Sequence, residues 1–114
     1  MTDHDVSRAI LMKTDEFGGM IGITIDRFAD MLGSDVKQLN LNMASLSAGG
    51  FIRIDWGYPD FVILTLLPFG VVALKAIKEE SVWEKSKAHL KESEASFTML
   101  IENAFRVMWH CIVK

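Results

Sequence analysis

Residues 23–33 read ITIDRFADMLG and carry the most specific structural signal in the chain. The β-branched residues up to Thr24 suit a short strand, and Thr24 itself can cap a helix that follows. Gly33 is the residue type that most often stands just past a helix end. Four apolar residues between them recur at helical spacing: Ile25, Phe28, Ala29 and Leu32. The stretch predicts a strand, a short helix and a tight turn in succession.

A second helix is expected directly after this turn, over residues 36–48. Ser34 and Asp35 are good capping residues at its start, and Gly49 and Gly50 stop it. Its apolar residues lie on one face: Val36, Leu39, Met43 and Leu46. The polar side chains therefore lie mostly on the opposite face, away from the core.

An antiparallel hairpin follows the two glycines. Residues 51–56 alternate between apolar and polar, residues 61–66 are almost wholly apolar, and the four residues between them are rich in turn formers. Pro68 then stands where a further helix can begin. With a helix before Phe17 and a strand over residues 20–25, the expected order is helix, strand, helix, helix, hairpin, helix.

Three motifs in this order resemble those of winged helix-turn-helix transcriptional regulators, especially the multiple-antibiotic-resistance repressor superfamily and related small dimeric repressors. Residues 23–33 are similar to the ITxxxLAxxLG string of bacterial repressors, and residues 50–52, GFI, correspond to the GLI that enters the wing. Residues 66–70, LLPFG, are similar to the LTxxG that closes it, with Leu67 in place of threonine. The resemblance covers about residues 5–80. It implies a mainly α fold with a small β-hairpin wing (α+β), followed by a long C-terminal helix.

The resemblance also implies that helix 35–48 lies in the major groove of double-stranded DNA, with the hairpin 51–66 as a wing. Asn and Gln side chains can bind an adenine edge, Leu can contact a thymine methyl, and a helix start can bind phosphate. The residues expected to contact DNA are Ser34, Lys37, Gln38, Asn40, Leu41, Asn42, Ser45, Arg53 and Tyr58.

The charge distribution opposes DNA binding. The 114 residues include 12 Lys and Arg against 15 Asp and Glu, a net charge of −3. Residues 1–80 alone carry −4, the expected recognition helix has no arginine, and the wing carries Asp55 and Asp60. Because phosphate neutralisation supplies most non-specific affinity, a second function stays open. It is a winged-helix module that binds another protein, as an anti-repressor or assembly factor.

Trp56 and Tyr58 stand at the expected wing tip. We expect one of them to fold onto the base of the hairpin. If both stay exposed, they make a possible site for a protein partner, because Trp and Tyr are frequent interface anchors.

Residues 81–114 are expected to form a second part, after a winged-helix domain of residues 1–80. Ser81 and Glu84 fit a capping box, residues 84–94 are almost wholly polar, and the helix from Phe97 is apolar on most sides. This helix can pack on the first helix of its own chain, or it can pair with a second copy, and we favour a homodimer. The expected dimer contacts are Phe97, Leu100, Ile101, Ala104, Phe105, Met108, Trp109 and Ile112.

Enzymatic function is not expected. With Cys111 as the single cysteine, the chain can form neither an internal disulfide nor a thiolate zinc site, and it contains no glycine-rich phosphate loop. Glu102 and Arg106 are four residues apart and are expected to form a helical ion pair. We therefore expect no metal and no cofactor. The charged residues within the apolar runs argue against a membrane span, and the acidic N-terminus is unlike a secretory signal, so a cytoplasmic location is expected.

Overall fold

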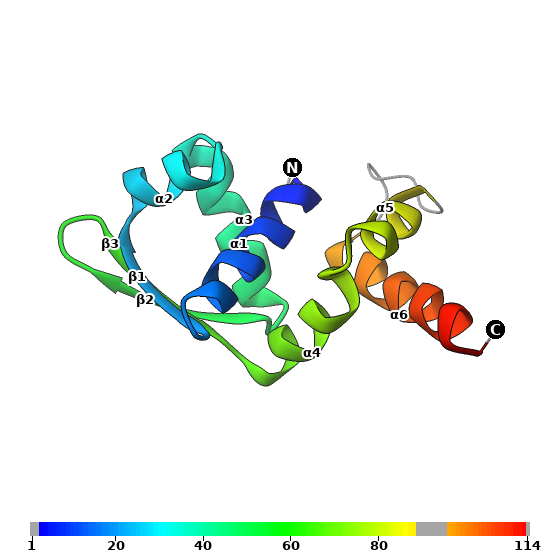
Figure 1. Ribbon diagram of the computed structural model, residues 1–114. Helices are drawn as coiled ribbons and strands as arrows, with labels where there is room; N and C mark the ends of the chain where they lie inside the picture. Colours follow the sequence, from blue (N-terminus) through cyan, green and yellow to red (C-terminus); the bar gives the residue numbers. More distant parts are fainter. Residues whose placement is uncertain (1–2, 89–95, 114) are drawn as a thin grey trace. The chain divides into compact units, whose positions relative to one another are not determined.

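The computed structural model describes residues 3–88 and 96–113, with side chains described as far as Trp109 (Figure 1). It divides into two compact units, Met1–Val71 and Val72–Lys114, which we call the N-terminal unit and the C-terminal unit. The sequence predicted this boundary later in the chain, after residue 80.

The N-terminal unit contains the expected order of elements. They are α1 (His4–Glu16), β1 (Met20–Thr24), α2 (Ile25–Leu32), α3 (Val36–Ala48), β2 (Ile52–Gly57), β3 (Phe61–Leu66) and the start of α4 (Pro68–Ile77). The chain is therefore mainly helical with a small antiparallel sheet, which confirms the predicted α+β class.

The sheet has three strands in the order β1-β3-β2. The predicted hairpin pairs Ile52 with Leu66, and β1 adds to its other side by pairing Met20 with Thr65. An isolated two-stranded hairpin is marginal in water, so the third strand stabilises it. Figure 1 shows the turn between β2 and β3 at the outer end of the sheet, clear of α3.

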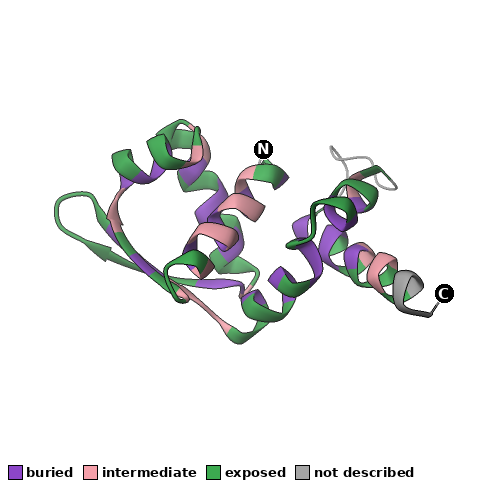
Figure 2. Ribbon diagram, viewed as in Figure 1, coloured by how far each residue is buried: buried purple, intermediate pink, exposed green. Residues whose placement is uncertain are grey.

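The core of the N-terminal unit lies between one face of the sheet and the helices α1 and α3 (Figure 2). The alternation along β3 buries Val62 and Leu64 on this face. The helices and the loop after α3 contribute Ile10, Leu11, Phe28, Leu39, Met43, Leu46 and Phe51, all almost inaccessible to solvent. Burial of each such side chain contributes about 1.5–3 kcal/mol, so this apolar layer holds α3 in place.

The turn between α2 and α3 forms as predicted. Gly33 adopts the left-handed conformation with φ of 66°, which costs glycine little because it has no Cβ. Asp35 then caps α3 by accepting a hydrogen bond from the Gln38 N–H at 2.6 Å. Thr24 stands at the N-cap position of α2, as expected, but its side chain makes no capping hydrogen bond.

The C-terminal unit contains the rest of α4, α5 (Glu80–Ala88) and α6 (Phe97–Val113). The Trp83 N–H donates to the Glu79 carbonyl, so α5 begins before Ser81 and the predicted capping box is wrong. The polar stretch was expected to continue as a helix to residue 94, and residues 89–95 lie outside the described residues. In the part of the chain that the structure describes, no helix has the length and apolar character needed to cross a membrane.

Candidate nucleic-acid interface

One face of α3 is anchored in the core and the opposite face is open to solvent. Leu39, Met43 and Leu46 are buried completely or almost completely. The exposed side contains four of the residues expected to contact DNA: Lys37, Asn40, Leu41 and Ser45. The structure therefore brings these four onto one continuous surface, with the small side chain of Ala44 between them.

Asn42 does not belong to this surface, and its expected DNA contact is wrong. The residue is 0 % exposed. Its Nδ2 donates to Ser7 Oγ at 2.8 Å and to the Asp3 carbonyl, while its Oδ1 accepts from Gln38 Nε2 at 2.6 Å. The amide is buried because the start of α1 packs over this side of α3. Asn42 therefore joins two helices and cannot reach a base edge.

Two further residues near the start of α3 are only half-buried and have local partners. Gln38 donates to Asn42, and the Ser34 hydroxyl donates to the Asp35 carbonyl at 3.2 Å. Asp35 places a carboxylate at the helix N-terminus, where the backbone N–H groups would otherwise attract phosphate. The start of α3 is thus a weaker anion site than the sequence indicated.

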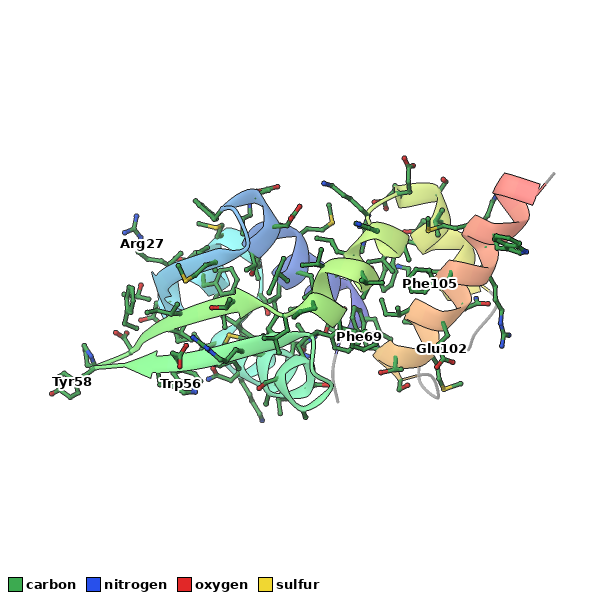
Figure 3. The ribbon with its side chains drawn as sticks, turned by 90° about the horizontal axis from the view of Figure 1, so that it is seen from below. Arg27, Trp56, Tyr58, Phe69, Glu102 and Phe105 are labelled. Carbon is green, nitrogen blue, oxygen red and sulfur yellow. The ribbon has the colours of Figure 1, made fainter. Side chains whose placement is uncertain are left out.

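The hairpin presents its expected residues to solvent. Arg53 is exposed, and its Nε lies 3.1 Å from Asp55 Oδ2 on the same strand. Tyr58 is 97 % exposed and Trp56 is 60 % exposed, so the expectation that one of them folds onto the base of the hairpin is wrong. Figure 3 shows both side chains at the outer end of the sheet. Both side chains stay exposed even though Trp56 lies directly opposite the buried Val62 in the sheet.

Arg27 is a basic residue that was not among the predicted DNA contacts. It is exposed on α2, the helix that precedes α3, and it makes no hydrogen bond or ion pair with the described residues (Figure 3). The signal was present in the sequence, since Arg27 is the only basic residue between Lys13 and Lys37.

Few basic groups of the N-terminal unit are available to an anion. Its residues include five Lys and Arg against nine Asp and Glu. Lys13 pairs with Glu16 at 2.8 Å, and Arg53 pairs with Asp55. In contrast, neither Lys37 nor Arg27 has an ion-pair partner among the residues that the structure describes. These two cations, on neighbouring helices, are therefore the best candidates for phosphate contacts.

The expected dimer contacts on α6 fall into two groups. Phe97, Leu100, Ile101 and Ala104 are buried within the chain, where α6 packs against α5. The Phe97 and Trp83 rings lie 6.1 Å apart, and Asn103 Nδ2 donates to the Ser86 carbonyl at 3.0 Å. These four side chains therefore belong to the core of the C-terminal unit and are not open to a second copy.

The second group faces solvent at least in part. Phe105 and Trp109 are exposed, Met108 is partly exposed, and the side chain of Ile112 lies outside the described residues. The expected ion pair between Glu102 and Arg106 is not formed, so that prediction is wrong.

The described residues contain no group of three or more His, Cys, Asp and Glu side chains that could hold a metal ion. Comparison of the chain with protein-family models, with curated proteins and with solved structures finds no match.

Proposed function

We propose that the chain is a small dimeric winged-helix regulator that binds a specific DNA site, with α3 as its recognition helix and the β2–β3 hairpin as its wing. The order of helices and strands supports this proposal, as does the antiparallel three-stranded sheet. In winged-helix proteins, the second helix of the helix-turn-helix enters the major groove and the hairpin lies beside it.

The observation that carries the proposal is the division of α3 into a buried face and an open face. Three buried apolar residues fix the helix to the core, so the opposite face can meet a ligand without unfolding the unit. That open face combines Lys37 and Asn40 with Leu41 and the small Ala44 and Ser45. Small side chains let a helix approach a surface closely, and an α-helix fits the width of the major groove.

The side chains on the open face of α3 determine which bases it would contact. Asn40 can bind an adenine edge through two hydrogen bonds, and Leu41 can contact a thymine methyl. Lys37 and Arg27 would bind phosphates on either side of the helix, because they are the exposed cations of the N-terminal unit without a partner among the described residues. With only these two, one copy binds weakly, and two copies on a palindromic site combine their contacts.

The test is a selection from random double-stranded oligonucleotides with the full chain at physiological salt. We expect enrichment of a palindromic motif. Lys37→Gln should then weaken binding to all sequences and lower the slope of log affinity against log salt by about one. Asn40→Ala should relax the motif at one base pair and cost about 1–3 kcal/mol there.

Lys85→Gln is the matched control, because Lys85 is an exposed lysine on α5, in the other unit. It should leave the motif, the affinity and the salt slope unchanged. A selection that enriches no motif contradicts the proposal. A motif that survives both α3 substitutions keeps DNA binding but excludes α3 as the recognition helix.

A second function, binding to another protein, is favoured by the hairpin. Trp56 and Tyr58 are exposed beside Asp55 and Asp60, in a unit with nine acidic and five basic residues. Exposed aromatic residues next to carboxylates suit a basic protein partner better than a phosphate backbone. The same selection separates the two functions, since a protein-binding module enriches no DNA motif.

A further inference from the structure

The face of α6 that points away from α5 combines apolar and charged side chains. Met99 is 45 % exposed and Trp109 is 65 % exposed, and Glu102 and Arg106 lie between them on the same side of the helix. Figure 3 shows Glu102 projecting from α6. This surface differs from the dimer contacts that the sequence indicated, half of which are buried against α5.

Glu102 and Arg106 have no partner within the described part of the chain. Residues four apart on a helix are neighbours, yet no ion pair joins these two. A shallow pocket lies at the same place and is lined by Met99, Glu102, Asn103 and Arg106. This face therefore has a negative group, a positive group and a shallow pocket, and none of the described residues pairs with these groups.

We propose that this face binds a second copy of the chain, with the two α6 helices antiparallel and a two-fold axis level with residue 104. In this register Glu102 of each copy lies opposite Arg106 of the other. Two ion pairs form, related by symmetry, and each uses groups that have no partner among the described residues of their own chain. Met99 of each copy then lies opposite Trp109 of the other.

The orientation follows from the order of the charges. In a parallel pair with two-fold symmetry, Glu102 would lie level with the second copy's Glu102, and Arg106 with its Arg106. Like charges at one level destabilise an interface, whereas the antiparallel pair alternates their signs. The antiparallel register also places the Trp109 side chain over the pocket that Met99 lines, where sulfur and an aromatic ring make a favourable contact.

The proposed function requires a dimer, and this pair of α6 helices would be its interface. It is tested by sedimentation equilibrium of the full chain without DNA, so a failure of DNA binding leaves the result unaffected. We expect a reversible monomer–dimer equilibrium for the unmodified chain.

Charge reversal tests the register. In a dimer of the Glu102→Arg variant, both symmetry-related ion pairs become pairs of arginines. In a dimer of the Arg106→Glu variant, both become pairs of glutamates. Each variant alone should therefore have a dimer dissociation constant at least about tenfold higher than that of the unmodified chain. An equimolar mixture of the two variants should form a heterodimer of about the original affinity. The chain that carries both substitutions should dimerise with itself again.

Lys85→Glu is the control, because it reverses an exposed charge on α5 and should leave the dimer unchanged. Recovery in the mixture shows that both single variants are folded, since unfolded chains cannot complement each other. Three results would overturn the proposal: an unmodified chain that remains monomeric, single variants that dimerise as well as the unmodified chain, and a mixture that fails to recover the dimer.

Discussion

The Asn42 amide donates a hydrogen bond to the Ser7 hydroxyl oxygen at 2.8 Å, and this contact joins α3 to α1 inside the N-terminal unit. Both residues are buried. The same side chain also binds the Asp3 carbonyl, the Asp3 N–H and Gln38 Nε2. Asn42 therefore uses its donors and its acceptor within the protein, and its contribution is to stability.

Asn42→Ala should destabilise the N-terminal unit strongly. The substitution removes the contacts between the two helices and leaves Ser7 without its buried partner, which costs about 2–3 kcal/mol. The measurement is urea unfolding followed by circular dichroism.

Asn40→Ala is the matched control, because Asn40 is the same residue type on the exposed side of α3. It should change the free energy of unfolding by less than about 0.5 kcal/mol. A result in which the two variants are equally stable would show that the buried amide network contributes nothing to the free energy of unfolding.

Gly70→Ala should also destabilise the chain, although helices generally prefer alanine to glycine. Gly70 is in the first turn of α4, and a Cβ at this position would collide with the carbonyl oxygen of Phe51. Helix propensity alone predicts a gain of about 1 kcal/mol for this change. Since the obstacle is backbone, we expect a loss of at least about 2 kcal/mol, measured by thermal and urea unfolding.

Val71→Ala provides the comparison, because Val71 is the next residue of α4 and is exposed. Its effect should stay within about 0.5 kcal/mol. If Gly70→Ala instead stabilises the chain, the close approach of α4 to the Phe51 carbonyl is wrong.

The elements of the N-terminal unit were predictable because their signals are local. Residues 36–48 were expected to be helical, and α3 has these bounds, since Asp35 caps its start and glycines follow its end. The hairpin was predictable from alternation and turn residues. The pairing of β1 with β3 was not, because it joins segments about forty residues apart and no local pattern encodes it.

The site was less predictable than the fold. Exposure on a helix depends on which neighbour packs over it, so nothing near Asn42 in the sequence reveals that α1 covers it. The buried face of α1 includes the polar residues His4, Ser7 and Thr14. A search for apolar residues at helical spacing does not identify them as buried. The prediction of an ion pair between Glu102 and Arg106 was wrong for another reason. An ion pair along a helix contributes only about 0.2–0.5 kcal/mol, which is too little to fix two long side chains.

Phe97→Ala tests the packing of α6 on α5. Phe97 is buried beside Trp83, and removal of a buried phenylalanine ring costs about 3–5 kcal/mol. The variant should unfold at a lower urea concentration, as measured by tryptophan emission. Phe105→Ala is the control on the same helix, because Phe105 is exposed. This substitution should lower the free energy of unfolding by less than about 1 kcal/mol.

These measurements should be made at two protein concentrations, since a second copy on α6 would add stability that depends on concentration. If Phe97→Ala and Phe105→Ala lower the free energy of unfolding equally at the lower concentration, one face of α6 is not buried within its own chain.

Asp55→Asn should strengthen DNA binding if the hairpin is a wing. The substitution releases Arg53 from its ion pair at 3.1 Å and removes a negative charge from the strand. Both groups are exposed, so the pair itself contributes little stability, and the free energy of unfolding should stay nearly constant. We expect affinity for the selected DNA site to rise about threefold to tenfold and the salt slope to steepen, as more counterions are released.

The control for Asp55→Asn must separate the release of Arg53 from the change in net charge. Asp30→Asn removes the same charge from the exposed side of α2, where no ion pair holds the carboxylate within the described residues. It should raise affinity less than Asp55→Asn, and Asp55→Asn combined with Arg53→Gln should lose the advantage. If Asp30→Asn and Asp55→Asn act equally, Arg53 contacts no phosphate and the hairpin contributes only to the overall charge. If neither changes DNA affinity, the hairpin lies away from the DNA, and Trp56 and Tyr58 remain available to a protein partner.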